Sequence, residues 1–293
     1  ATNDMVYLGA TGTVTDGAAG YIVADKLALV GGAVTLDHAS NSVNTLAASN
    51  VSAVTYANAG ALTIGTVNPT GITATGDVRI ETLTGDLTVS ENISTTSTTV
   101  NAILLNAGKN TAAGTTTGGN LIVSGSPTIT AGTGGTIRLM SGSVAGSTGL
   151  TDLVGSGTGR FRYNSDETAT NYTLALATGV VNAIYRERPT ATATINSYSV
   201  VYGFDHTQTL NNLKADGSAV STSRLALNGD ETVPGLGLTI GSAVFATGGK
   251  LKSSVTPYTL TDGLAKLGYT MNQSGGSQLT VTPKALTFAG LVI

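Results

Sequence analysis

The chain has 293 residues, of which 11% are charged and 41% hydrophobic, with 39 Gly, no Cys and a formal net charge of −3. This composition excludes intrinsic disorder, which goes with low hydrophobicity and high net charge, and it excludes disulfides and thiolate chemistry. Without a surplus of basic residues, the chain is not expected to bind nucleic acid or to attach electrostatically to a membrane. Abundant Thr, Val and Gly predict a mostly β protein with frequent turns.

Residues 1–159 contain short apolar segments in which aliphatic residues flank a polar one. A period of two predicts strands whose aliphatic side chains point inward and whose Thr, Asn or Arg points outward. Gly, Asn, Asp or Ser separates nearly all of these segments, which favours turns between them. The predicted strands are residues 33–36, 43–46, 54–56, 62–64, 78–80, 87–89, 103–105, 121–123 and 137–139.

Several of these segments share a Gly-(Asp/Asn/Ala)-φ-x-φ motif, in which φ is aliphatic; it occurs at residues 60–64, 76–80, 85–89 and 119–123. Degenerate self-similarity of this kind is typical of a solenoid, and we expect a right-handed parallel β-helix over residues 1–159. An antiparallel sandwich also has strands at this spacing. We favour the β-helix because the motifs are alike and because all four Phe and most Tyr residues lie after position 160.

Residues 160–189 introduce charge and aromatic side chains abruptly, beginning at Arg160–Glu167 and continuing through Asn171–Leu174. A solenoid needs a bulky or polar cap over its open end, so we expect this segment to be a capping junction. The run Tyr185–Pro189 is expected to be an extended linker, since the residue before Pro avoids the helical region.

Residues 190–284 are expected to form a small β-rich domain, for which a β-grasp arrangement is one option. A helix is considered at residues 210–216 or 262–266. Residues 285–293 are expected to begin a further, truncated module. The strand candidates are residues 191–195, 199–202, 236–240, 258–261, 269–273 and 278–282.

The junction resembles the end of the β-helical stalk of filamentous-haemagglutinin-like exoproteins, which two-partner systems of Gram-negative bacteria secrete. The resemblance lies in Arg160–Tyr163, Asn171-Tyr172 and Tyr185–Thr190. Residues 190–284, with Val201–Phe204 near their start and Leu279–Lys284 near their end, resemble the small tandem modules of the Tyr-Gly-x and Tyr-Asp-Gly types (MBG-like) in that family.

This resemblance implies a secreted adhesin segment on the outer surface of a Gram-negative bacterium. Its implied partners are glycans, exopolysaccharide or cell-surface receptors, an outer-membrane transporter for the parent protein, and a second copy of itself. Attachment through an extended stalk, with no enzymatic activity, is the function we expect. A β-helical carbohydrate-active enzyme or carbohydrate-binding protein and a self-assembling extracellular filament are the alternatives.

The search for chemistry in the sequence gives no catalytic, cofactor-binding or metal-binding residues. The densest acidic group is Asp77, Glu81, Asp86 and Glu91. If Asp77 and Asp86 hold the same place in successive motifs, they could share a corner or neighbouring corners, and a glycosidase would use such a pair of carboxylates. Solvated turn residues are the preferred interpretation, because Asp is favoured at turns. His38 and His206 lie in different predicted domains and are interpreted as surface histidines.

Overall fold

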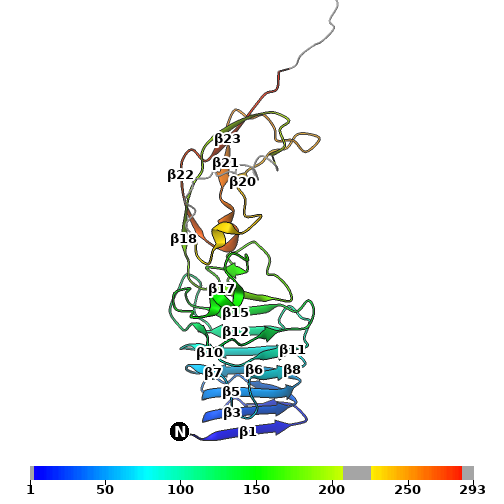
Figure 1. Cartoon of the computed structure of the whole chain (residues 1–293), viewed down its shortest axis with the longest axis vertical. Helices are drawn as coiled ribbons and strands as arrows, with labels where there is room; N and C mark the ends of the chain where they lie inside the picture. The colour runs from blue at the N-terminus through cyan, green and yellow to red at the C-terminus, as the bar shows by residue number, and fades with distance from the viewer. Residues whose placement is uncertain (1–2, 207–225, 286–293) are drawn as a thin grey trace, which may run out of the picture. The chain divides into compact units, whose positions relative to one another are not determined.

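The computed structural model describes residues 3–206 and 226–285 (Figure 1). The chain divides into two compact units: Ala1–Pro189 with Asn228–Asp230, and Thr190–Leu227 with Glu231–Ile293. Both units are built mainly from β-strands. The segment 160–189 contributes two strands to a sheet of the first unit, so it is part of that unit.

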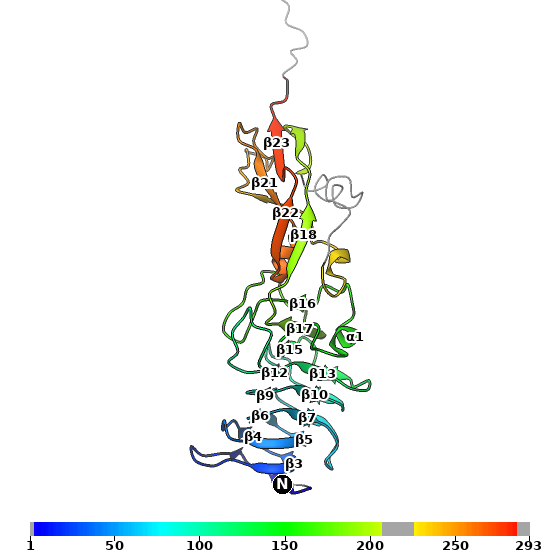
Figure 2. The same cartoon turned by 90° about the vertical axis from the view of Figure 1, so that its left-hand side faces the viewer.

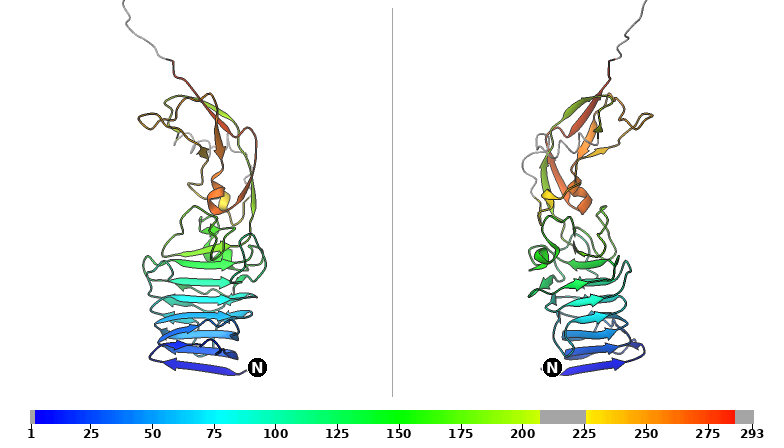
Figure 3. Two further views of the ribbon diagram at one scale, coloured as in Figure 1. Left: turned by 180° about the vertical axis from the view of Figure 1, so that it is seen from behind. Right: turned by 45° about the vertical axis from the view of Figure 1, so that its right-hand side comes forward.

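The first unit contains an eight-stranded sheet in which every neighbouring pair is parallel. Each strand pairs with the next strand of the same sheet along the chain, except that β15 skips β16 and pairs with β17, which leaves β16 at the edge beside β17 (Figures 1 and 3). The strands, in spatial order, are β2 (Val14–Thr15), β4 (Ala33–Leu36), β6 (Ala53–Asn58), β9 (Val78–Thr82), β12 (Ile103–Ala107), β15 (Ile137–Ser141), β17 (Val181–Tyr185) and β16 (Phe161–Arg162).

A nine-stranded parallel sheet forms the opposite wall, with β5, β7 and β10 facing β4, β6 and β9 across the unit in Figure 2. It begins with the long strands β1 (Met5–Ala10), β3 (Val23–Gly31) and β5 (Ser42–Val51). β5 then pairs with two short strands, through Thr45 with Thr63 and through Ala48 with Ile72. Two rows of short strands continue from there: β7 (Leu62–Ile64), β10 (Leu87–Val89) and β13 (Leu121–Val123), and β8 (Ile72–Ala74), β11 (Ile93–Thr95) and β14 (Ile129–Thr130).

Aliphatic side chains stack in columns between the two sheets, because paired strands keep the same register. Leu62, Leu87 and Leu121 form one such column and are at most 2% exposed. Burial of each such side chain contributes roughly 1.5–3 kcal/mol. A second column in the opposite sheet consists of Val34, Val54, Val78, Ile103, Ile137 and Val181.

The nine strands predicted before residue 160 are confirmed in position. β1 and β3 were not predicted, because stretches such as Lys26–Val30 do not alternate in polarity. β8, β11 and β14 were not predicted because two or three residues give too short a pattern. The five-residue helix α1 (Leu150–Val154) was also unexpected; its Leu150 and Val154 are buried in the first unit.

The predicted linker Tyr185–Pro189 is wrong at its first two residues, which belong to the core. Tyr185 ends β17 and stacks on Phe161 and Tyr163, with ring centroids 6.4 Å and 5.6 Å away. Arg186 is 0% exposed. Its guanidinium donates to the carbonyl oxygens of Ala107 (2.6 Å), Gly119 (2.8 Å) and Thr117 (3.1 Å). Because backbone acceptors replace water around the charge, an arginine can be buried at this point.

Arg162 is buried in the same way. It donates to the carbonyl oxygens of Gly159 (2.7 Å), Phe161 (2.7 Å), Leu174 (2.9 Å) and Ala175 (2.5 Å). Burial lowers the pKa of both the Arg162 and the Arg186 guanidinium. The two arginines therefore tie loop backbone to the final strands of the eight-stranded sheet.

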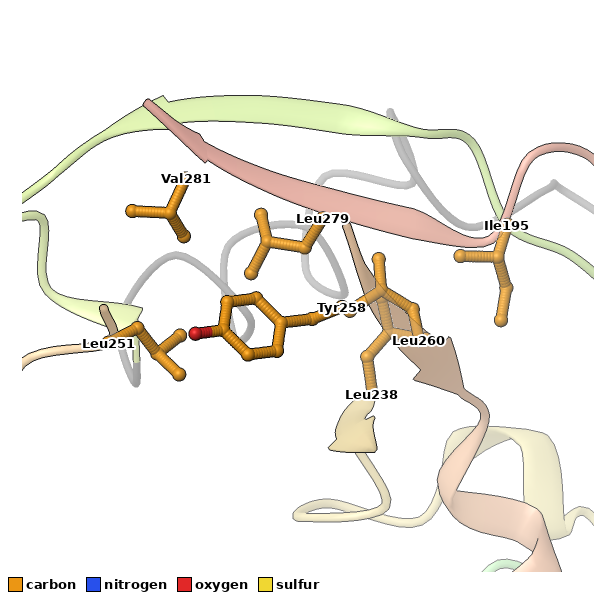
Figure 4. Packing of buried hydrophobic residues seen from close by; sticks show 7 residues of the cluster. All are labelled: Ile195, Leu238, Leu251, Tyr258, Leu260, Leu279 and Val281. Atoms are coloured by element: carbon orange, nitrogen blue, oxygen red, sulfur yellow. The ribbon is translucent and has the colours of Figure 1, made fainter. Parts of the chain in front are cut away.

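The second unit has a two-stranded parallel sheet, β18 (Thr190–Thr194) with β22 (Thr270–Ser274), and a mixed four-stranded sheet. The latter has the order β19 (Tyr198–Val201), β23 (Gln278–Thr282), β21 (Tyr258–Thr261) and β20 (Thr239–Gly241). All six predicted strands overlap these elements. The main core of the second unit is shown in Figure 4. It consists of Ile195, Leu238, Leu251, Tyr258, Leu260, Leu279 and Val281.

Two short 3₁₀ helices accompany these sheets, η1 (Asp230–Thr232) and η2 (Gly263–Leu267). η2 lies at one of the two places where a helix was considered. The Asp262 side chain caps it by accepting from the backbone N–H of Leu264 at 2.9 Å. The other place, residues 210–216, lies outside the described residues.

Candidate functional site

Three outward-facing side chains line up on the eight-stranded sheet of the first unit. Leu104 on β12 is in register with Arg79 on β9 and with Arg138 on β15. Both arginines occupy the polar position of a φ-x-φ segment, so the alternation that buries their aliphatic neighbours turns them outward. The same outer face carries Met140 of β15 and Ile184 of β17, which are also in register.

Loops cover this part of the sheet. The Asp166 carboxylate accepts from the backbone N–H groups of Ala113 (2.7 Å), Thr168 (2.7 Å) and Ala169 (2.5 Å). Burial acts to raise the pKa of Asp166, but these hydrogen bonds outweigh it and lower the pKa to about 2. Glu167 accepts from the backbone N–H of Asn110. The two carboxylates thus join the loop after β12 to the loop after β16.

Tyr172 and Leu176, further along the second loop, pack against a cluster of Leu104, Met140 and Ile184. The guanidinium of Arg162 stands 5.5 Å from the centroid of the Tyr172 ring, a cation–π distance. This packing fixes the loop and the tyrosine ring over the outer face of the sheet.

A pocket of about 220 Å³ remains between the loops and the sheet. We call it the outer-face pocket. Its wall combines an apolar floor with charged and hydroxyl groups, the mixture that orients small polar ligands. The lining residues are Arg79, Leu104, Arg138, Met140, Asp166, Glu167, Thr170, Tyr172 and Ile184.

The charges around the pocket are unevenly compensated. Glu81, whose side chain is 1% exposed, pairs with Arg79 at 2.8 Å and with Lys109 at 2.9 Å. Burial acts to raise the pKa of Glu81, but the bonds from Arg79 and Lys109 outweigh it and lower the pKa. Arg138 instead donates to a neutral group, the side-chain oxygen of Asn101, at 2.5 Å. Burial lowers the pKa of Arg138.

Two buried polar atoms of the pocket residues have no hydrogen-bond partner in the part of the chain that the structure describes: Nε of Arg138 and Oε2 of Glu167. A buried donor or acceptor left unpaired costs about 1–3 kcal/mol. Both atoms belong to side chains that line the pocket, where a ligand that reaches them would supply the missing partner.

Asp77 and Asp86 do not share a corner; they precede two consecutive strands, β9 and β10, and so lie at neighbouring corners, the second of the two options considered. Asp86 precedes β10, whose register partners are β7 and β13, so its equivalents are Ala61 and Asn120. Asp77 precedes β9 in the other sheet. Its carboxylate accepts from the hydroxyls of Ser97 (2.5 Å) and Thr99 (2.8 Å).

The carboxylates of Asp86 and Glu91 also have hydrogen-bond partners nearby. Asp86 accepts from the backbone N–H of Asn120 at 2.8 Å, and Glu91 accepts from the Thr66 hydroxyl at 3.0 Å. These bonds hold turns of successive strands together. Glu81 is the exception to a turn role, since it is buried on β9.

The two histidines lie in different units. His38 stacks on Tyr21 with centroids 5.6 Å apart, and its Nδ1 accepts from the Ser40 backbone N–H at 3.1 Å. His206 contacts the rings of Phe204 and Phe245, with centroids 6.3 Å and 5.5 Å away. Within residues 3–206 and 226–285, no three His, Cys, Asp or Glu side chains gather as metal ligands would.

The pocket residues were not singled out from the sequence. One signal was available: Arg79 and Arg138 stand at polar φ-x-φ positions in a chain where only 11% of residues are charged. Glu167 and Tyr172 fall in the segment predicted to be a capping junction, but nothing in the sequence placed them over the outer face, because contacts distant in sequence bring their loop to the sheet.

Comparison with models of known protein families, with curated proteins and with solved structures gave no match. Among the described residues, none of the helices has the length and apolar character needed to cross a membrane.

Proposed function

We propose that this chain is a structural and adhesive segment of a large secreted bacterial surface protein, similar to filamentous-haemagglutinin-like exoproteins. In this proposal the first unit is a right-handed parallel β-helix that serves as a stalk. The second unit is one of the small tandem modules that follow such a stalk. The parent protein would reach the outer surface of a Gram-negative cell through an outer-membrane transporter.

The observation that carries the proposal is the pairing of successive strand sets. β7, β8 and β9 pair in parallel with β10, β11 and β12, which pair in the same order with β13, β14 and β15. In the proposed β-helix, one such set of three strands is one coil, stacked on the coil before it. Parallel crossovers are right-handed in nearly all proteins, which supports the handedness we propose.

The Arg162, Arg186 and aromatic cluster supports a cap over the last coil. Open ends of stacked repeats expose unpaired strand edges and apolar side chains, so they need protection. Phe161, Tyr163 and Tyr185 are each 0% exposed and supply the bulk that such a cap requires.

Repeated polar rows on the outer walls support adhesion. Thr35 of β4 is in register with Thr55 of β6, and Thr63 of β7 with Thr88 of β10. Paired strands lie about 4.8 Å apart, so hydroxyls repeat at that spacing along each wall. Such rows suit hydrogen bonding to extended glycans, and contact without net charge is little affected by salt.

The enzyme alternative named Asp77 and Asp86, which lie at the starts of consecutive strands in different sheets, and both carboxylates already accept hydrogen bonds from neighbouring turns. Release of sugars from glycans incubated with the chain would be direct evidence for the enzyme alternative. The filament alternative would give polymers at high protein concentration in electron micrographs.

The test of adhesion uses beads coated with the full chain, applied to bacterial biofilm and to epithelial cell layers. Albumin-coated beads of equal protein density are the control. We expect more chain-coated beads to remain after washing, with little change between low and high salt. Equal retention of the two bead types on both surfaces would contradict the proposal.

A further inference from the structure

We infer that the outer-face pocket binds one acidic sugar residue, a hexuronate at the end or branch of a glycan. The inference rests on the proposed adhesive function and adds a ligand class and a site to it. The pocket is smaller than the roughly 300–1,000 Å³ that holds drug-sized ligands. At about 220 Å³, it has room for one ring and its substituents.

Arg138 supplies the site for a carboxylate. Its neighbour Arg79 already pairs with Glu81, whereas Arg138 donates to the neutral side chain of Asn101. Nε of Arg138 is buried and unpaired within the described residues. A guanidinium that offers Nε and a terminal nitrogen holds a carboxylate through two parallel hydrogen bonds.

Glu167 requires that the same ligand also donates a hydrogen bond. One of its carboxylate oxygens accepts from Asn110, and the other, Oε2, is buried without a partner in the described chain. A ligand with acceptors alone, such as inorganic phosphate, would leave this oxygen facing another anion. A sugar hydroxyl donates to it instead.

The apolar part of the pocket suits the C–H face of a sugar ring. Leu104, Met140 and Ile184 are each at most 5% exposed and form the floor, and Tyr172 lies against them. Tyr172 is held between this floor and the Arg162 guanidinium, so its orientation is fixed before a ligand arrives. A preorganised ring lowers the entropy cost of binding.

A second cavity of the first unit lacks this combination. It has about 330 Å³ and is lined by Val123, Gly125, Ser126, Pro127, Gly149, Asp152 and Leu153. Asp152 is its one ionisable side chain, so an acidic ligand has no cation there.

The test is calorimetric titration of the full chain with D-glucuronate, and with D-glucose as the neutral comparison. We expect saturable binding of glucuronate and at least tenfold weaker binding of glucose. Loss of a charge-assisted hydrogen bond of about 1.5–3 kcal/mol corresponds to roughly tenfold or more in affinity, so Arg138→Gln is expected to weaken glucuronate binding by that factor.

Further variants separate recognition from folding. Arg138→Lys keeps the charge but removes the two-nitrogen fork, and we expect an intermediate loss of affinity. Tyr172→Ala is expected to weaken binding, and Tyr172→Phe to leave it within about threefold, since the ring is kept. The matched control is Lys26→Gln, on the other sheet, which should bind as the unaltered chain does. Circular dichroism melts establish that each variant is folded.

Glucuronate binding that is absent, that is equalled by glucose, or that survives Arg138→Gln in a folded protein would overturn the inference. Beads that still attach while glucuronate fails to bind would remove this site and leave the adhesive function standing. Glucuronate binding without bead attachment would leave the site standing and remove the adhesive function.

Discussion

The first unit buries its side chains in columns, whereas the second buries them in a compact cluster. In the first, Leu62, Leu87 and Leu121 contact their counterparts on parallel neighbours in strict register. In the second, Tyr258 and Leu260 of β21 lie between two antiparallel neighbours, β20 and β23, and aromatic residues such as Tyr202 and Phe204 pack against the same core. A column can be lengthened by repetition, but a cluster of this kind cannot.

This difference explains where the candidate site lies. Repetition constrains the inward positions of the first unit and leaves the outward ones free to vary. Arg79 and Arg138 use that freedom without disturbing Val78, Ile80 or Ile137. A polar pocket can therefore form on a repetitive sheet at no cost to its core.

The largest effect is expected from Arg186→Met, which probes whether the first unit depends on its buried arginines. The change leaves the carbonyl oxygens of Ala107, Thr117 and Gly119 without their donor. Buried acceptors of this kind cost about 1–3 kcal/mol each, and we expect a loss of about 4 kcal/mol. Urea unfolding followed by hydrogen–deuterium exchange measures it. Lys26→Met, which removes a cation of the same unit that has no ion pair in the described chain, is the control and should change stability by less than about 0.5 kcal/mol.

A pair of core truncations tests whether the two units unfold separately. Leu105 and Leu260 are each 0% exposed, one in each unit. Each change to Ala is expected to cost about 3 kcal/mol in its own unit. Exchange rates of amides in the other unit should stay unchanged. Equal acceleration in both units by either variant would show that the two cores unfold together.

Gly60 and Gly119 occupy equivalent places before β7 and β13, with Gly85 at the equivalent place between them, and allow these turns to be compared. Gly119 has φ +142°, and a Cβ there would lie 2.0 Å from the carbonyl oxygen of Gly85. Gly60 has no heavy atom within 4 Å of its Cβ position and no positive φ. We expect Gly119→Ala to cost about 2 kcal/mol and Gly60→Ala to stay within about 0.5 kcal/mol. Thermal melts of both variants would reveal any reversal of this order.

The smallest expected effect is on the stability of the first unit at acidic pH. The folded pKa of Asp166 is lowered to about 2 from an ordinary value of about 3.9, so its ionised form stabilises the first unit. That contribution is complete above about pH 4 and is lost as the pH falls towards 2. Asp166→Asn should therefore reduce the fall in urea midpoint between about pH 5 and pH 2.5. Exposed Asp152→Asn is the control and should keep the slope of the unaltered chain.

Much of the first unit could be predicted from its sequence, because strand positions follow from local alternation. The segments at Leu87 and Leu121 show this period clearly, and both are strands. The burial of Arg186 could not be predicted, since the carbonyl oxygens that accept its hydrogen bonds lie up to 79 residues away in the sequence. Asp77 and Asp86 share a motif but enter different sheets, because a local motif does not identify the sheet that a strand joins.

The pocket was beyond sequence reasoning for a similar reason. The loops that form it are held by Asp166 to Ala113 and Glu167 to Asn110, pairs separated by 53 and 57 residues. Neither contact repeats along the chain, so the periodicity of the sequence could not predict either one. Two arginines at outward positions were the one visible sign.

The most direct test of the central claim is a glycan array probed with the labelled full chain and with Arg138→Gln, followed by mass analysis of the printed glycans. We expect signal on glycans with an exposed acidic sugar, at least a tenfold weaker signal from the variant, and unchanged glycan masses. Shortened glycans would contradict a non-enzymatic adhesive segment. Absence of signal above albumin on every glycan would contradict glycan adhesion.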